Sequence, residues 1–407
     1  MHIVIPESVG FSSARLARIS AAMQRYVDAG KIAGLITTVA HCGQTVHLAT
    51  LGQMDREAGK EMQFDTIFRI ASMTKPVTAV AIMMLYEEGY FTLNTPVFEF
   101  IPGFKDLKVF VRETPDGVEL ADLVRPVTFR HLFTHTAGLS YGWNPDDPVD
   151  RLYQKQREEA GTPEEQSTVK DMVEGLTRLP LAFQPGTKWR YSLAIDVLGH
   201  IIEIISGKPL DEFFKERLFG PLGMVDTDFW LPREKAGRLA ALYGHSNDSP
   251  DLKLLEAPAD SPRFDKPAFL SGGGGLLSTV ADYARFLQML TNGGELNGAR
   301  LLSPTTVDLF TINQAPAAAL PYGFAQGEDL FHMGYGYSLG TRVLMDVAAS
   351  GKAGSLGEFG WDGAFNTYCW VDRKQALYGL LMTQHNPNNY YPLADMFKQL
   401  TYQALVK

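Results

Sequence analysis

The chain of 407 residues contains only two cysteines, Cys42 and Cys369, which lie far apart in the sequence. Two distant thiols provide neither the paired spacing of a disulfide framework nor the clustered spacing of a zinc site. Because strand-like apolar segments surround both residues, we expect two buried, unreactive thiols. No stretch approaches the roughly 18 uncharged apolar residues that a membrane-spanning helix needs. We therefore expect neither a metal nor a membrane partner.

The chain also lacks an excess of positive charge, since 37 Lys and Arg stand against 46 Asp and Glu and the net charge is -9. Such a chain repels phosphate backbones, which makes nucleic acid a poor partner. The N-terminal stretch, MHIVIPESVGFSSARL, has no basic segment followed by a long apolar one. We therefore expect no secretory signal and a cytoplasmic location.

Helical and strand-like patterns follow one another in an order that indicates an α+β fold. A helical pattern over 12–31 precedes two strand-like segments, 35–43 and 44–52. Helical patterns then recur at 76–89, 194–207 and 279–294, with one hairpin pattern at 109–120 that has Asp116 and Gly117 at its turn. Strand-like segments return at 335–346, 364–373 and 375–384, and a helical pattern at 391–406 follows them.

The length of the chain exceeds the roughly 250–300 residues at which single cores stop growing, so we expect two domains. The simplest packing places both ends of the chain in one antiparallel sheet flanked by helices. Residues 1–70 and 326–407 would form this α/β domain, and residues 71–325 a large, mainly helical inserted domain. The active site would lie in the cleft between them.

A hydroxyl and an amine lie three residues apart where the helical run after Ile70 begins. The sequence RIASMTKPVTAV contains Ser72 and Lys75, an S-x-x-K pattern whose members share one helix face. Burial and the positive end of the helix both disfavour a charged lysine, so the amine can accept the hydroxyl proton. The pattern predicts a serine nucleophile with a lysine base. The backbone N–H of Ser72 would serve as one oxyanion donor.

Competing motifs have weaker contexts. Ser140 in GLSYG and Ser338 in GYSLG fit G-x-S-x-G, but neither follows a strand and opens a helix, as a nucleophile elbow requires. His131 and His135 are four residues apart without the glutamate of a zinc protease motif. We expect all nine histidines to be satisfied by hydrogen bonds. The glycines at 272–275 lack the Gly-Lys-Ser/Thr of a phosphate loop, so they indicate a flexible turn beside a cleft or a simple bend.

Four segments together resemble the serine β-lactamase and penicillin-binding-protein superfamily, and are most similar to the family VIII carboxylesterases. They are FRIASMTKPVTAVAIMMLYEEG, FRHLFTHTAGL, QPGTKWRYSLAIDVLG and FGPLGMVDTDFW. The resemblance implies a β-lactamase/transpeptidase-like fold, no cofactor, and a catalytic tyrosine that corresponds to Tyr191. It also implies that FGWDGAFNT supplies the third motif, with Trp361, Asp362 and Gly363 binding substrate and the Ala364 N–H as the second oxyanion donor.

Departures from the family pattern favour an ester over a lactam. Trp361 replaces the lysine that attracts the drug carboxylate, and the adjacent Asp362 would repel one. Leu193 replaces an asparagine that would bind the lactam side-chain amide. Aromatic residues near the proposed cleft, such as Tyr141, Trp143 and Trp361, suggest an apolar substrate pocket, although core packing is an equal interpretation.

The sequence therefore predicts a serine hydrolase of the S-x-x-K type, a carboxylesterase that cleaves a small-molecule, short-acyl ester through an acyl-enzyme. A β-lactamase or D-alanyl-D-alanine peptidase, an acyltransferase and a non-catalytic ligand-binding protein stay open as alternatives. The oligomeric state cannot be inferred from these motifs.

Overall fold

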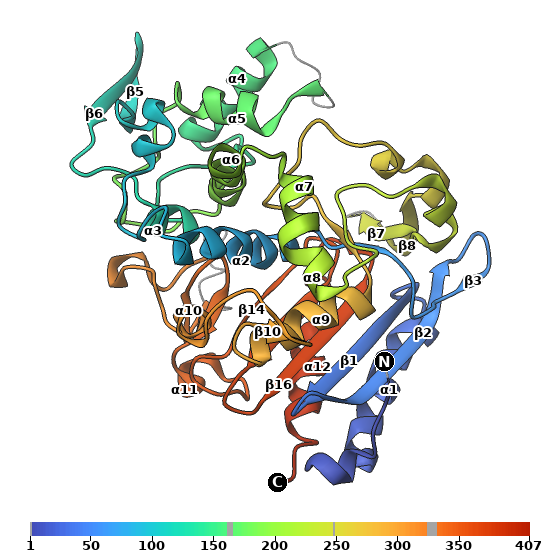
Figure 1. Ribbon diagram of the computed structural model, residues 1–407. Helices are drawn as coiled ribbons and strands as arrows, with labels where there is room; N and C mark the ends of the chain where they lie inside the picture. Colours follow the sequence, from blue (N-terminus) through green and yellow to red (C-terminus); the bar gives the residue numbers. More distant parts are fainter. Residues whose placement is uncertain (1, 161–165, 247–248, 324–331) are drawn as a thin grey trace.

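A computed structural model describes residues 2–160, 166–246, 249–323 and 332–407. Its largest sheet has eight strands in the order β12-β13-β14-β15-β16-β1-β2-β3, and each neighbouring pair is antiparallel. The N-terminal and C-terminal parts of the chain meet where β1 pairs with β16 (Figure 1). The strands are β1 (Gly34–His41), β2 (Gln44–Asp55), β3 (Lys60–Glu61), β12 (Tyr335–Tyr337), β13 (Arg342–Leu344), β14 (Phe359–Asp362), β15 (Tyr368–Asp372) and β16 (Leu377–Thr383).

Helices cover both faces of this sheet, which confirms the predicted α+β fold class. Helices α1 (Ser13–Asp28) and α12 (Leu393–Tyr402) pack together on one face. The side chain of Ser12 caps α1 by accepting from the Arg15 N–H, and the apolar stripe of this helix joins a core that contains Trp370. Helix α9 (Val280–Thr291) packs against β15 and β16.

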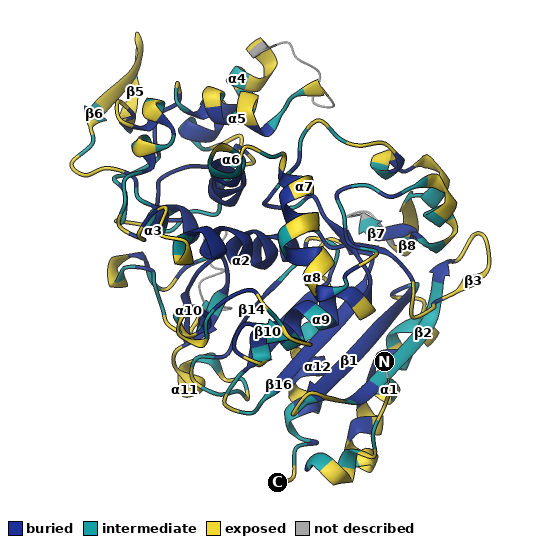
Figure 2. Cartoon of the chain, in the orientation of Figure 1, coloured by how far each residue is buried: buried dark blue, intermediate teal, exposed yellow. Residues whose placement is uncertain are grey.

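Helix α2 (Thr74–Glu87) is buried on every side. Each residue from Thr74 to Leu85 is buried, and the helix is dark blue along almost its whole length in Figure 2. A helix that is hydrophobic all round belongs in the interior, and α2 packs against α6 (Ala194–Ser206) and contacts β14. Its first turn, which contains Lys75, therefore begins deep inside the protein.

The remaining elements surround the sheet: in Figure 1 most of those before residue 260 lie above it, and several of those after residue 300 lie to its left. They are β4 (Phe68–Arg69), β5 (Lys108–Thr114), β6 (Gly117–Asp122), α3 (Phe129–Phe133), α4 (Pro148–Ala160), α5 (Val169–Leu176), α7 (Leu210–Phe214), α8 (Gly220–Leu222), β7 (Leu242–Ser246), β8 (Ser249–Glu256), β9 (Leu277–Ser278), β10 (Glu295–Leu296), β11 (Ala299–Arg300), α10 (Pro304–Phe310), α11 (Val347–Ser350) and β17 (His385–Asn386). The predicted domain boundary between 325 and 326 lies outside the described residues.

Three local expectations need correction. Cys42 is exposed, because it and Gly43 form the two-residue turn between β1 and β2, with φ values of 49° and 75°. Cys369 is buried on β15 as expected. The hairpin pairs Thr114 with Gly117, so its turn is one residue earlier than predicted. Segment 335–346 forms two strands, β12 and β13, rather than one.

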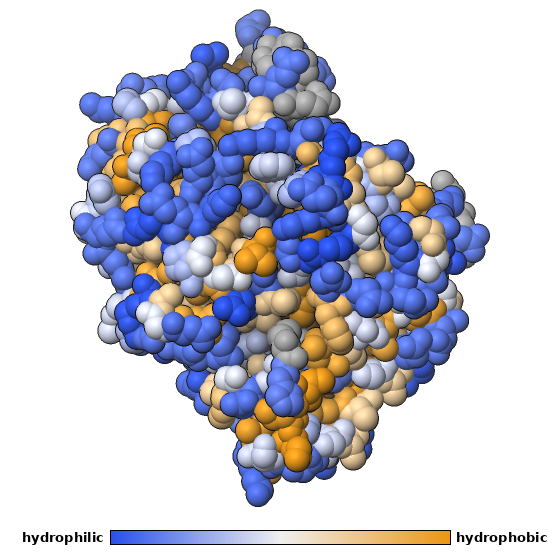
Figure 3. All heavy atoms as spheres, turned by 45° about the vertical axis from the view of Figure 1, so that its right-hand side comes forward, coloured by the Kyte–Doolittle hydropathy of each residue, from blue (hydrophilic) through white to orange (hydrophobic). Residues whose placement is uncertain are grey.

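The visible surface is mostly polar (Figure 3). Hydrophilic side chains cover most of the face shown in Figure 3, and apolar ones gather toward its lower end. Within the described residues, the helices are too short or too polar to cross a membrane.

Candidate active site

Ser72 lies in a tight turn between β4 and α2. The turn is a short 3₁₀ helix, Ala71–Met73, and the N–H of Met73 closes it by donating to the Ile70 carbonyl at 3.0 Å. Ala71 has a φ of 44°, in the left-handed region that costs a non-glycine residue roughly 1 kcal/mol or more. The chain thus turns sharply at the residue before Ser72.

Lys75 contacts Ser72 from the first turn of α2. Its Nζ lies 3.1 Å from the Ser72 Oγ and donates to the Gly273 carbonyl at 2.6 Å. The side chain is fully buried, and this burial lowers its pKa to about 7, although Asp196 and Asp362 act in the opposite direction. A large fraction of the amine is therefore neutral near pH 7. A neutral amine can accept the proton of Ser72.

Gly273 and Asp196 hold the other side of the lysine. The Asp196 Oδ1 accepts from the Gly273 N–H at 2.9 Å and from the Ser271 hydroxyl at 2.6 Å. A Cβ on Gly273 would lie 2.4 Å from the Asp196 Oδ2, so a side chain there would collide with the carboxylate. Gly273 is thus required for close packing beside Lys75, and the sequence analysis, which predicted a turn or a bend here, did not name Asp196 as its neighbour.

Tyr191 approaches the same pair from the segment before α6. The Lys75 Nζ lies 4.5 Å from the centre of its ring. Burial raises the pKa of the Tyr191 phenol, and hydrogen bonds with Ser72 and Trp361 partly offset this effect. The structure therefore brings Ser72, Lys75 and Tyr191, the three residues predicted to be catalytic, into one site.

The end of β14 lies beside the Ser72 turn. A Cβ on Gly363 would lie 2.3 Å from the Ile70 carbonyl oxygen, so only glycine allows this approach. The next residue, Ala364, is exposed in a turn. Among the described residues, neither the Ser72 N–H nor the Ala364 N–H donates a hydrogen bond, so both are available to a bound oxyanion.

The other predicted binding residues differ in their surroundings. Trp361 is buried and donates from Nε1 to the Tyr191 hydroxyl at 3.2 Å. The Asp362 carboxylate accepts from the Arg342 Nη1 and from the Asn388 Nδ2, each at 2.7 Å. Its negative charge is therefore paired, which the sequence did not reveal.

Tyr141 extends the site outward. Its half-buried ring lies 5.3 Å from the ring of Tyr191 and stacks on Trp143 at 4.1 Å. Trp143 is 66% exposed, so these aromatic rings lead from the catalytic residues to the surface.

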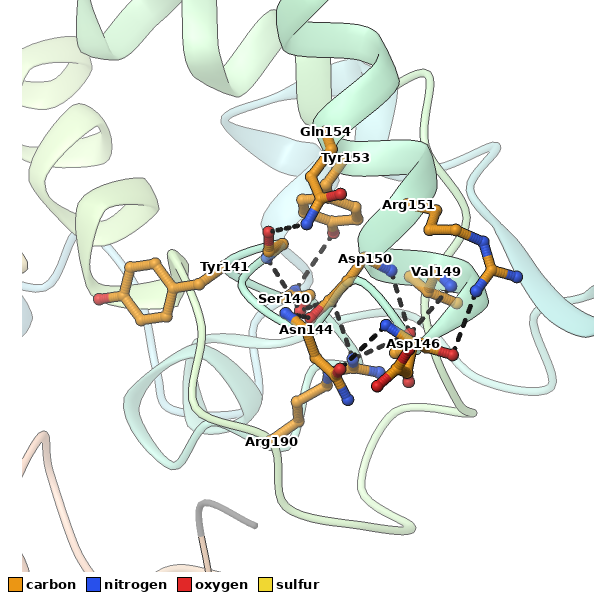
Figure 4. A network of polar contacts seen from close by, with 12 residues as sticks. Ser140, Tyr141, Asn144, Asp146, Val149, Asp150, Arg151, Tyr153, Gln154 and Arg190 are labelled. Carbon is orange, nitrogen blue, oxygen red and sulfur yellow. Dashed lines mark hydrogen bonds and ion pairs between the residues drawn. The ribbon is translucent and has the colours of Figure 1, made fainter. Parts of the chain in front are cut away.

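The hydroxyls of Ser140 and Ser338, the two serines in G-x-S-x-G patterns, donate hydrogen bonds within the fold. Ser140 donates to Asp150, whose carboxylate also accepts from Arg190, within the polar network of Figure 4. Ser338 is buried and donates to the Leu309 carbonyl at 2.9 Å. Neither hydroxyl has a lysine or histidine partner among the described residues. Within the same residues, no group of three or more His, Cys, Asp or Glu side chains is arranged to hold a metal.

Comparisons with known proteins find a family model, relatives and a solved structure that match nearly the whole chain. The family model described as Beta-lactamase matches residues 19–403. Protein Rv1367c of Mycobacterium tuberculosis (strain ATCC 25618 / H37Rv) is 36% identical over 90% of both chains. Esterase EstB of Burkholderia gladioli is 31% identical over 93% of both chains. The solved structure of EstCE1, a hydrolase with promiscuous acyltransferase activity, covers 97% of this chain and 99% of its own with a TM-score of 0.77 at 24% identity.

Proposed function

Because the chain belongs to the β-lactamase family of serine hydrolases, we propose that it is a carboxylesterase that cleaves short-acyl esters through a Ser72 acyl-enzyme. The observation that carries this proposal is the contact of 3.1 Å between the Ser72 Oγ and a lysine whose pKa burial lowers to about 7. The family includes relatives named as esterases, an acyltransferase and peptidases, so the substrate class must come from the site itself.

The acylation step begins when neutral Lys75, assisted by Tyr191, takes the proton of Ser72. The Ser72 Oγ attacks the ester carbonyl, and the N–H groups of Ser72 and Ala364 stabilise the negative oxygen that forms. The proton then passes through Tyr191 to the leaving alcohol as the bond between the carbonyl carbon and the alkoxy oxygen breaks. Water, activated by the same two residues, later releases the acid from Ser72. No step requires a metal or a cofactor.

The walls of the site favour a neutral ester. Trp361 places an uncharged indole where the resemblance to lactam-hydrolysing members of the family implies a lysine, so a substrate carboxylate would lack that lysine as a partner. Leu193, which stands in place of an asparagine, has no side-chain amide that could bind the substrate. Tyr141 and Trp361 would contact the apolar parts of the ester. Gly363 allows the end of β14 to approach Ser72, and Asp362 is the last residue of that strand.

Turnover of p-nitrophenyl butyrate, together with intact mass spectrometry after a fluorophosphonate probe, tests the proposal. We expect one adduct, on Ser72, and a loss of several orders of magnitude in kcat for Ser72→Ala. Ser140→Ala is the matched control, because its hydroxyl has only structural partners, and should keep activity within about twofold of the parent. An adduct on Ser140 or Ser338, or an active Ser72→Ala, would refute the mechanism.

The remaining activities have their own signatures. Faster turnover of a chromogenic cephalosporin than of the butyrate ester would identify a β-lactamase instead. A new ester or amide product in the presence of an added alcohol or amine would identify an acyltransferase. A parent protein that neither reacts with the probe nor turns over any ester would be a binding protein.

A further inference from the structure

Tyr191 occupies a segment without regular secondary structure. It lies three residues before α6 begins at Ala194, in a stretch that belongs to no helix or strand. Catalytic groups must be held within about 0.5 Å of their working positions, and a misplacement of about 1 Å can cost about a hundredfold in rate. Because Tyr191 lies in no helix or strand, contacts with other segments must place the phenol.

A neighbouring loop supplies backbone contacts to this segment. The N–H of Ala182 donates to the Gly138 carbonyl at 2.7 Å, and that of Gly186 donates to the Thr136 carbonyl at 2.8 Å. On the N-terminal side of Tyr191 the Arg190 N–H donates to the His135 carbonyl at 2.9 Å, and on its C-terminal side the Leu193 N–H donates to the Ser140 carbonyl at 3.5 Å.

His135 contacts the residues on both sides of Tyr191 and the tyrosine itself. Its carbonyl accepts from Arg190, and its Nδ1 lies 3.2 Å from the Ser192 hydroxyl. Between these two bonds, the imidazole ring packs on the Tyr191 ring with 4.7 Å between centres. One residue thus holds three consecutive residues of an otherwise irregular segment.

The conformation of His135 is costly for stability. Its φ is 53°, in the left-handed region, and its side chain is fully buried. The Nε2 is also buried and has no hydrogen-bond partner among the described residues. Burial, together with the charge of Lys75, lowers the pKa of this histidine well below its usual value, so the ring is neutral. Strained residues of this kind cluster at functional sites, and the ring of His135 contacts Tyr191.

We propose that His135 is a positioning residue that fixes the Tyr191 phenol against Lys75 and Ser72. The proposal rests on the proposed function, because it assigns Tyr191 the proton transfer of the acylation step. A neutral imidazole protonated on Nδ1 donates to the Ser192 Oγ, and its Nε2 then keeps only a lone pair, which is less costly to bury than an unpaired N–H. The bond to Ser192 prevents rotation of the imidazole, and the ring face then limits the movement of the phenol.

Three variants test this role with p-nitrophenyl butyrate. His135→Phe keeps an aromatic ring but loses the bond to Ser192, and Ser192→Ala removes the same bond from the other side. We expect each to lower kcat about tenfold with KM within about twofold of the parent. The double variant should be no slower than the slower single variant, because both changes break one interaction. His135→Asn, whose amide can donate to Ser192 and which tolerates the left-handed backbone, should keep several-fold more activity than His135→Phe.

The control is His131→Asn, because this nearby imidazole contacts Thr128 instead and should leave kcat unchanged. Parental kcat in Ser192→Ala, or losses that multiply in the double variant, would overturn the proposal, and Ser192→Ala decides the matter even if His135→Phe fails to fold. These outcomes differ from a failure of the proposed function, in which the parent itself would show no turnover and no labelling of Ser72.

Discussion

The indole N–H of Trp361 donates to the Tyr191 hydroxyl oxygen at 3.2 Å and so joins β14 to the segment that contains the Tyr191 phenol. A bond donated to this oxygen favours the phenolate over the phenol, which opposes the effect of burial on the Tyr191 pKa. Trp361 therefore acts on Tyr191, the tyrosine that we propose to be catalytic. Steady-state kinetics can separate this effect of Trp361 on Tyr191 from a role of Trp361 in substrate binding.

Trp361→Phe removes this donor and keeps an aromatic ring. We expect kcat for p-nitrophenyl butyrate to fall about three- to tenfold, the range that corresponds to one neutral hydrogen bond, while KM stays within about threefold of the parent. Steady-state kinetics measure both constants. A rise in KM alone would instead assign Trp361 to substrate binding.

The protonation of Lys75 predicts the dependence of activity on pH. Burial lowers the pKa of this lysine to about 7, and the amine must be neutral to accept the Ser72 proton. Activity should therefore decrease as the pH falls through about 7, about tenfold for each unit below it, and level off above about pH 8. The measurement is kcat/KM for a short-acyl ester between pH 5 and 9.

Lys75→Arg provides the control for this interpretation. A guanidinium stays charged throughout the accessible pH range, so the variant should lose at least about a thousandfold in kcat without recovering at high pH. A profile that is flat between pH 5 and 9 in the parent would contradict the assignment of Lys75 as the base.

The sequence allowed the fold class and the proposed nucleophile to be predicted for different reasons. Local patterns predicted the long helices and the two N-terminal strands, and S-x-x-K at the start of an apolar helix led to the hypothesis that Ser72 and Lys75 act together. Asp196 escaped notice because a single carboxylate in an apolar helix has no local signature. The pairing of Asp362 with Arg342 was equally hidden, because the two residues are 20 positions apart and meet only through adjacent strands.

The exposure of Cys42 was missed for a related reason. The apolar residues before it suggested a buried strand, but the strand ends at His41, and the turn residue points outward. The glycines at 272–275 were predicted as a turn, yet the packing of Gly273 depends on Asp196, a residue of α6 that lies 77 positions earlier in the sequence. Contacts between distant segments, rather than local propensity, determined each of these features.

Gly273→Ala tests the packing beside Lys75. The new Cβ would lie 2.4 Å from the Asp196 Oδ2, so the loop must shift and the Gly273 carbonyl must move away from the Lys75 Nζ. We expect kcat to fall at least about tenfold, since displacements of about 1 Å in a catalytic site have effects of this size or larger.

Gly237→Ala is the matched control, because a Cβ at that position has no neighbour within 4 Å. It should change neither kcat nor the midpoint of thermal unfolding by more than the experimental error. Parental activity in Gly273→Ala would show that the carbonyl of the glycine loop has no part in orienting Lys75.

Asp362→Asn distinguishes a structural carboxylate from a substrate ligand. Asp362 and Arg342 are 19% and 16% exposed at their side chains, and removal of the negative charge leaves the guanidinium without its ion-pair partner. The new amide would also direct hydrogens toward Asn388. We expect the free energy of unfolding to fall by about 1–3 kcal/mol, measured by urea denaturation, with KM for a neutral ester within about twofold of the parent.

Asp395→Asn is the control for the loss of charge alone. Its partner is Lys352, and their side chains are 53% and 30% exposed, so the ion pair is screened by solvent and its loss should cost less than about 0.5 kcal/mol. If Asp362→Asn instead raised KM more than about tenfold and left stability unchanged, the carboxylate would contact the substrate, as the resemblance to the family implied. The measured ratio between the two effects therefore decides whether the acidic residue beside Trp361 selects the substrate or fixes the strand that supports Tyr191.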